Sequence, residues 1–175
     1  MIKNKWMIAA GMTLGLILTG CSETTVTESN EEPKEEVMPE PTANTELSDY
    51  GTEMEGYLSD FTVTMTDFSN LNSEAANNPS IMLTDDWIMD ISLSLVTMEE
   101  HINNIRSVDA PAEVQKSHEH VLQAMDSFQY VVDNYPNAID NVDVELLGSC
   151  VEAMTEGGQQ LDKATVELNK VTADM

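Results

Sequence analysis

From about residue 46 to the C-terminus, apolar residues recur three and four positions apart, which is the period of an amphipathic α-helix. Four stretches of this kind follow one another, and the alternating pattern of a half-buried strand is not found among them. Their expected inward-facing stripes run over residues 47–71, 88–105, 114–135 and 147–171. We therefore expect four helices that each bury one face in a common core.

Prolines give an independent check, because a proline inside a helix costs about 3 kcal/mol and is expected in connections. The helical region contains Pro79, Pro111 and Pro136, and each of them falls between two of the stripes in this interpretation. The connection near 107–111 is short enough to make the second and third helices antiparallel. Alternating steps of three and four favour packing at about 20°. The fold class predicted for residues 46–175 is all-α, an up-down-up-down four-helix bundle.

The N-terminus has the three zones of an export signal. Two lysines lie within the first five residues, an uncharged stretch covers 6–18, and two small residues precede Cys21. The apolar run is shorter than the ~20 residues that a helix needs to cross ~30 Å of hydrocarbon. We expect residues 1–20 to be a signal peptide rather than a permanent membrane span.

The sequence Leu18-Thr19-Gly20-Cys21 resembles the lipobox of bacterial lipoproteins, in which an aliphatic residue, a small residue and Gly or Ala precede the lipidated cysteine. The resemblance implies cleavage before Cys21, a diacylglycerol on its thiol, and a lipid-anchored protein on the outer face of the cell membrane. The layout of the whole chain also resembles small helical lipoproteins of unknown function from Gram-positive bacteria. That likeness implies a setting and a fold, and it implies no catalytic activity.

After Cys21, the chain up to residue 45 carries seven glutamates and three prolines and almost no apolar side chains. A segment of this composition cannot bury enough apolar surface to fold. We therefore expect residues 21–45 to form a disordered acidic linker, which holds the helical domain off the membrane.

Charge limits the partners of this protein. The chain has 7 Lys and Arg against 32 Asp and Glu, and removal of residues 1–20 takes away two lysines, which leaves a net charge of −27. Such a surface repels nucleic acid and anionic lipid head groups, so we expect no nucleic-acid partner. Once Cys21 is lipidated, Cys150 is the only thiol left, and on the fourth stripe we expect it to be a small buried hydrophobe.

Motifs of hydrolases, metalloproteases, P-loop proteins and dinucleotide-binding enzymes are missing from the sequence. We therefore expect a non-enzymatic binding or interaction module, whose partner is a protein, a peptide or a cell-wall component. Gly157 and Gly158 interrupt the fourth stripe. They indicate either a close approach by a bulky side chain such as Tyr57 or Trp87, or a tolerated weak point in the helix.

The alternative function is a small-ligand or metal site inside the bundle. His101 and His118 lie at similar distances from the expected turn near 107–110, and Met125 lies two turns from His118. Two neutral imidazoles with a nearby thioether are suitable ligands for Cu or Zn. The other interpretation is that His118 is structural and forms a hydrogen bond across the bundle. Apart from the diacylglycerol at Cys21, no cofactor is expected, and the metal site stays an alternative.

Overall fold

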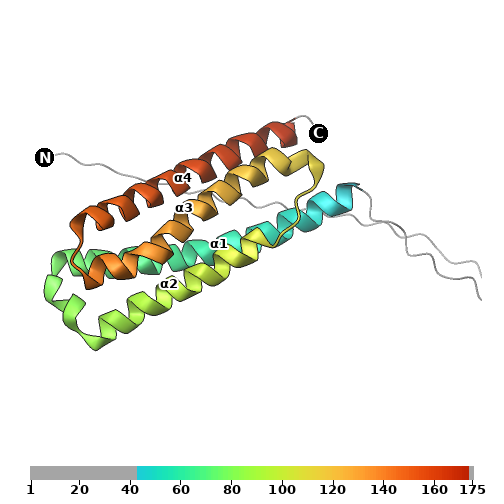
Figure 1. Cartoon of the computed structure of the whole chain (residues 1–175). Helices are drawn as coiled ribbons and strands as arrows, with labels where there is room; N and C mark the ends of the chain where they lie inside the picture. Colours follow the sequence, from blue (N-terminus) through green and yellow to red (C-terminus); the bar gives the residue numbers. More distant parts are fainter. Residues whose placement is uncertain (1–42, 174–175) are drawn as a thin grey trace, which may run out of the picture. The chain divides into compact units, whose positions relative to one another are not determined.

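The computed structural model describes residues 43–173, and their regular structure is entirely helical (Figure 1). Strands are not found in this part of the chain, so the prediction of an all-α fold with four α-helices is confirmed. The four helices and two short 3-10 helices are α1 (Ala43–Asn77), η1 (Pro79–Leu83), α2 (Asp85–Arg106), η2 (Ala112–Val114), α3 (Gln115–Asp140) and α4 (Val144–Ala173).

The helical region begins at Ala43, three residues before the expected domain boundary at residue 46. The expected signal peptide, Cys21 and most of the expected linker lie outside the described residues. Between residues 43 and 173, none of the helices combines the length and the apolar character that a bilayer span requires.

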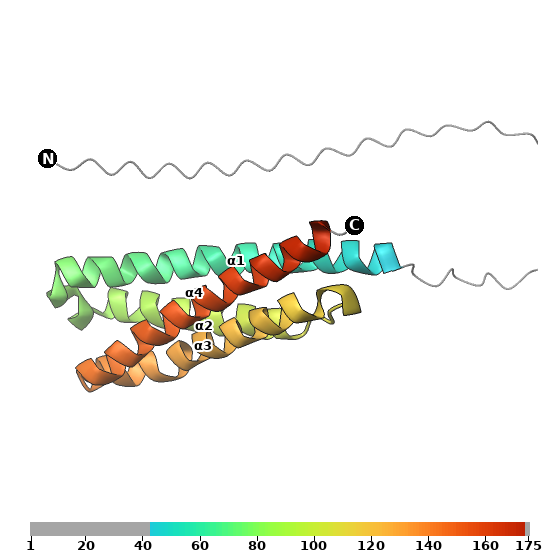
Figure 2. The same cartoon turned by 90° about the horizontal axis from the view of Figure 1, so that it is seen from above.

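The chain turns back on itself at each connection, so that consecutive helices lie alongside one another (Figures 1 and 2). α3 packs against both α2 and α4, and α1 packs against α2. By contrast, the backbones of α1 and α4 make almost no close approach to each other. The first and last helices of the described region therefore do not pack closely against each other.

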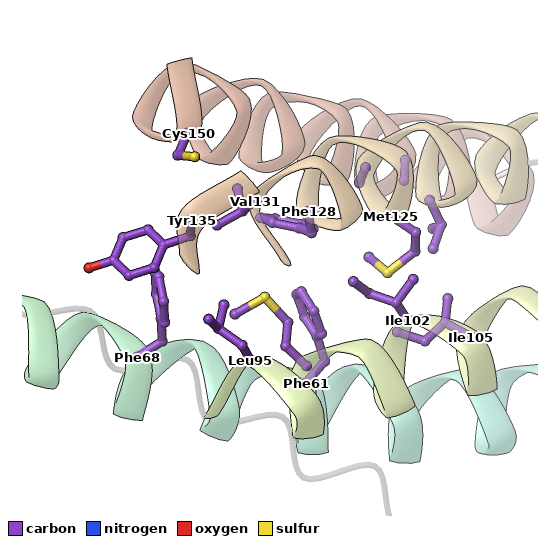
Figure 3. Packing of buried hydrophobic residues seen from close by; sticks show 14 of the residues in the cluster. Phe61, Phe68, Leu95, Ile102, Ile105, Met125, Phe128, Val131, Tyr135 and Cys150 are labelled. Carbon is purple, nitrogen blue, oxygen red and sulfur yellow. The ribbon is translucent and has the colours of Figure 1, made fainter. Parts of the chain in front are cut away.

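Aromatic pairs connect α1 to α3 through the centre of the core (Figure 3). The ring centroids of Phe61 and Phe128 are 4.9 Å apart. Those of Phe68 and Tyr135 are 5.0 Å apart in an edge-to-face arrangement, which aromatic quadrupoles favour. These contacts join residues far apart in the sequence, so they fix how the first half of the chain packs on the second.

At the start of α2, the buried residue is one position earlier than the sequence pattern predicts. Trp87 is buried there, whereas Ile88 is 47% exposed. The indole N–H of Trp87 donates to the backbone carbonyl of Leu71 at 3.1 Å, and its backbone N–H donates to the Thr84 hydroxyl at 3.4 Å. Thr84 therefore acts as the N-cap of α2, and Trp87 fastens this end of α2 to α1.

The expectation that every proline lies in a connection is wrong for Pro136. Pro79 opens η1 and Pro111 precedes η2, but Pro136 lies inside α3. Its own side chain is exposed, while its neighbours Tyr135 and Ala138 are buried. Burial of these neighbours offsets the lost hydrogen bond and keeps the chain helical up to the end of α3.

The connection from α3 to α4 covers only residues 141–143. The backbone N–H of Asp143 donates to the carbonyl of Ala138 at 2.8 Å, and Val142 has a φ of 52°, which together form a Schellman-type end of α3. The Asp143 carboxylate then accepts from the backbone N–H of Leu146 at 3.0 Å, as an N-cap of α4. This tight turn keeps α4 close to α3.

Candidate binding groove between α1 and α4

A groove of about 600 Å³ lies between α1 and α4, and α3 forms its floor. Its volume lies within the usual range of ligand sites. Most of its side chains are apolar, and they come from α1, η2, α3 and α4; they include Leu47, Leu58, Val114, Val121, Leu161 and Leu168.

The groove exists because α4 rests on α3 through small residues. Gly157 is buried, and a Cβ placed on it would lie 2.7 Å from Cζ of Phe128, too close for a side chain without movement of the ring. Two turns further along α4, the backbone carbonyl of Ala164 accepts a hydrogen bond from the Ser117 hydroxyl at 2.8 Å. Gly157 and Ala164 thus let α4 approach α3 closely, and α4 leaves α1 uncovered.

The expected close neighbour of Gly157 is therefore present, but it is Phe128 and not Tyr57 or Trp87. Sequence spacing alone could not identify it, because the neighbour depends on which helix packs against α4. Gly158 differs from Gly157, since a Cβ there would meet nothing within 4 Å.

The apolar stripe of α4 is only partly used in the core. Its fully buried residues are Cys150, Gly157 and Ala164. Leu161 is half-buried, and Leu168 is 39% exposed, because α1 does not cover this side of α4. A stripe whose buried positions are small and whose large positions stay open indicates an unfilled groove. The sequence contains the small residues, but only the structure shows which positions of the stripe are buried.

Tyr50 and His118 form a polar contact at one wall of the groove. The Tyr50 hydroxyl oxygen lies 3.0 Å from Nδ1 of His118, and their ring centroids are 5.7 Å apart. Burial lowers the pKa of His118, although the nearby charge of Asp109 acts in the opposite direction. Burial also raises the pKa of Tyr50. At neutral pH both side chains are therefore uncharged, and the contact is a hydrogen bond between α1 and α3.

The structure does not bring His101 and His118 together. Arg106 at the end of α2 pairs with Asp126 of α3 at 2.6 Å, which relates the levels of the two helices. This reference, in antiparallel helices, separates His101 and His118 by 13 residues along the axis, and the contact of Met125 with Ile102 and Ile105 (Figure 3) separates them by 8 to 11 residues. The axial distance between the two histidines is therefore roughly 12–20 Å. The segment 107–114 runs on past the end of α2 instead of reversing at once (Figure 1), which spacing from the turn could not reveal.

Met125, the third candidate ligand, is fully buried and lies beside Ile102 and Ile105 (Figure 3). It is two turns from His118, or about 10 Å along α3. Ligands of one Cu or Zn ion lie about 2.0–2.3 Å from it and therefore within a few ångströms of one another. Over residues 43–173, moreover, no three His, Cys, Asp or Glu side chains are grouped as metal ligands. The hydrogen-bond partner of His118 in the structure is Tyr50.

Cys150 is buried, as the sequence predicts. Burial raises the pKa of its thiol, so the reactive thiolate is disfavoured. The neighbouring Tyr135 donates its hydroxyl proton to Asn72, and burial raises the pKa of Tyr135 to about 12. These groups pack the core and supply no nucleophile. Cys21, the expected lipidation site, lies outside the described residues.

Searches of the chain against protein-family models, curated proteins and solved structures found no match. The features that bear on function are therefore the groove and its charged surroundings. Residues 43–173 carry 24 Asp and Glu against only 4 Lys and Arg. An apolar groove in a strongly acidic helical unit is suited to a partner that is both apolar and basic.

Proposed function

We propose that this protein is an extracytoplasmic lipoprotein, anchored to the outer face of the cell membrane by a diacylglycerol on Cys21. Its helical unit, an up-down-up-down four-helix bundle, acts as a non-enzymatic binding module. The lipobox-like tetrapeptide at Leu18 to Cys21 supports the anchor, and the short connections between consecutive helices support the bundle. The acidic linker 21–45 places this unit away from the membrane surface.

The observation that carries the binding function is the apolar groove between α1 and α4. Its occupant in this proposal is an amphipathic helix of a partner protein, with apolar residues on one face and Lys or Arg on the other. A helix that lies in such a groove would bury its apolar face against Leu58, Leu161 and Leu168. Its basic face would meet the acidic surface of the bundle and speed association.

The groove is tested by two substitutions on α4. Leu168 lines the groove and is 39% exposed, whereas Val166 is 54% exposed and does not line it. Leu168→Glu and Val166→Glu therefore introduce the same charge on one helix, with little effect on the core. The probe is a synthetic basic amphipathic helical peptide, and the measurement is its fluorescence anisotropy with the full chain.

We expect Leu168→Glu to weaken peptide binding about tenfold or more, because a carboxylate would be buried against apolar side chains. Val166→Glu should bind as the unchanged chain does. Equal loss in both variants, or equal binding of an acidic peptide with the same apolar face, would contradict the proposal. Self-association abolished by Leu168→Glu would instead identify a second copy of the chain as the occupant.

The anchor is tested separately with Cys21→Ala. We expect this variant to leave the membrane fraction or to accumulate as the uncleaved precursor, because position 21 then has no thiol to receive the lipid. Cys150→Ala is the matched control and should be processed and retained normally. Processing and retention of Cys21→Ala equal to those of the unchanged chain would contradict the lipoprotein assignment.

A further inference from the structure

A second pocket, of about 360 Å³, lies between α1 and α2 and is distinct from the groove between α1 and α4. Its volume is at the lower end of the range for small-molecule sites, so it suits a small molecule better than a polypeptide segment. Three carboxylates line it: Asp67 and Glu74 from α1 and Asp90 from α2.

These carboxylates have no cation to neutralise them in the described part of the chain. Residues 43–105 contain 12 Asp and Glu and no Lys or Arg. The ion pairs formed by the described residues all use Arg106, Lys116 or Lys170. The negative charge around this pocket is therefore left for a ligand to neutralise.

The side chain of Ser94 gives independent evidence that the pocket holds a ligand. It lines the same pocket and is 7% exposed, and its hydroxyl has no hydrogen-bond partner among residues 43–173. A buried hydroxyl without a partner carries a desolvation penalty, and most buried polar groups in proteins are satisfied. A donor in the pocket, such as an ammonium group, would give Ser94 the partner that it lacks.

The arrangement of the carboxylates favours an elongated cation over a single metal ion. Asp67 and Glu74 are seven residues apart on one face of α1, which separates them by about 10 Å. They do not converge on one point with Asp90, in agreement with the lack of a metal-ligand group in the described region. Leu71 lies between them on α1, and Leu93 of α2 lines the same pocket.

We propose that this pocket binds a linear aliphatic polyamine. Its terminal ammonium groups would pair with Asp67 and Glu74 of α1. Another of its ammonium groups would lie near Ser94 and Asp90 of α2. The methylene segments between them would lie against Leu71 and Leu93, as the stem of a lysine lies on apolar surface. This inference does not depend on peptide binding in the groove or on the lipid anchor. The polyamine site and the proposed function can therefore be tested, and can fail, separately.

The test is calorimetric titration of the full chain with spermidine at physiological ionic strength. The pocket variant combines Asp67→Asn, Glu74→Gln and Asp90→Asn. The control variant removes the same charge from exposed positions outside the pocket, with Glu113→Gln, Glu119→Gln and Asp162→Asn. We expect one spermidine per chain for the unchanged protein and the control variant, and at least a tenfold loss of affinity for the pocket variant.

Ser94→Ala separates a ligand-binding role from a structural one. The substitution removes a buried hydroxyl that has no partner in the described structure, so the free protein should be as stable as before or more stable. Spermidine affinity should nevertheless fall about threefold to tenfold, because the ammonium group loses an acceptor. Circular dichroism melts with and without spermidine measure both effects on the same samples.

Three results would overturn the proposal. Equal weakening in the pocket and control variants would show diffuse attraction to the acidic surface. Displacement of spermidine by equimolar Mg²⁺ would show a hard-cation site. Tighter binding of a short lysine-rich peptide than of spermidine, with the same dependence on the three carboxylates, would assign the pocket to a basic polypeptide.

Discussion

The pair α3–α4 and the pair α1–α2 are built differently, although both are pairs of packed α-helices. α3 and α4 are joined by polar contacts at several levels: Ser117 donates to Ala164, and His120 Nδ1 lies 3.0 Å from the side-chain oxygen of Gln160. Lys116 of α3 also pairs with Glu167 of α4 at 3.1 Å. The helices approach closely at Gly157 and Ala164 and their charges are partly paired, although a surface pocket of about 420 Å³ also lies between them, near Asp126 and Glu152.

The α1–α2 pair encloses a pocket and leaves polar atoms without partners. Ser94 and His101 each have a buried side-chain atom with no hydrogen bond among the described residues, and both belong to α2. All four basic residues of the described region lie at or after residue 106. The comparison teaches that helix pairs in one helical unit can have different roles: α3 and α4 are joined by paired polar groups, whereas α1 and α2 keep unpaired charge and a buried hydroxyl without a partner, which suit them for binding.

The largest expected effect tests the close packing of α3 on α4. Gly157→Leu should lower the free energy of unfolding by about 3 kcal/mol, because the added side chain meets the Phe128 ring, which is itself packed on Phe61. Gly158→Leu is the matched control, and its open surroundings should allow a gain of up to about 1 kcal/mol from helix propensity. Urea denaturation measures both, and equal effects would show that Phe128 does not limit this position.

A smaller effect on stability tests the contact of Tyr50 with His118, which joins the α1–α2 pair to the α3–α4 pair. Tyr50→Phe should cost about 1 kcal/mol, because it removes the hydrogen bond to His118.

The pH dependence of stability tests the same contact. The pKa of His118 is lowered in the folded state, so the unfolded chain binds the proton first as pH falls below its ordinary value of about 6.5. His118 therefore makes the protein less stable as pH falls from 7 through 6.5 toward the folded-state pKa. His118→Gln lacks this titration, and its stability should fall less over that range. Parallel pH profiles of the two proteins would contradict the lowered pKa.

The smallest effect compares the charges of the two pairs. Asp126→Asn should lose a few tenths of a kcal/mol, because the exposed pair with Arg106 is broken. Asp67→Asn should gain a similar amount, because it removes one charge from a region without basic residues. Thermal melts at low salt would reveal the opposite signs, and both differences should shrink at high salt. A loss in both variants would mean that Asp67 has a stabilising partner.

The four helices could be predicted from the sequence because each has a long apolar stripe, and helix period is a local property. Pro136 could not be placed correctly, because its position inside α3 depends on the burial of Tyr135 and Ala138 on either side. Local patterns give the type of an element, and tertiary packing decides where it ends.

The sites were harder to predict than the helices. The expected pairing of His101 with His118 assumed that the chain reverses directly after α2. In the structure, residues 107–114 continue beyond the end of α2 before α3 begins, so equal distance from the turn does not put the two histidines at the same level. The groove and the polyamine pocket depend on which helices fail to touch and on which polar atoms lack partners. These properties belong to pairs of helices, although two sequence signals point to them: the small residues of α4 and the lack of Lys and Arg in residues 43–105.

The most direct test of the division between the two helix pairs is hydrogen–deuterium exchange of the full chain, with and without spermidine. Without ligand, we expect amides in 64–74 and 90–97 to exchange faster than amides in 117–135 and 153–164, because they flank a pocket with unsatisfied polar groups. Spermidine should slow exchange in the first two segments and leave the last two unchanged. Uniform exchange across the four helices, or ligand protection centred on α3 and α4, would contradict this account.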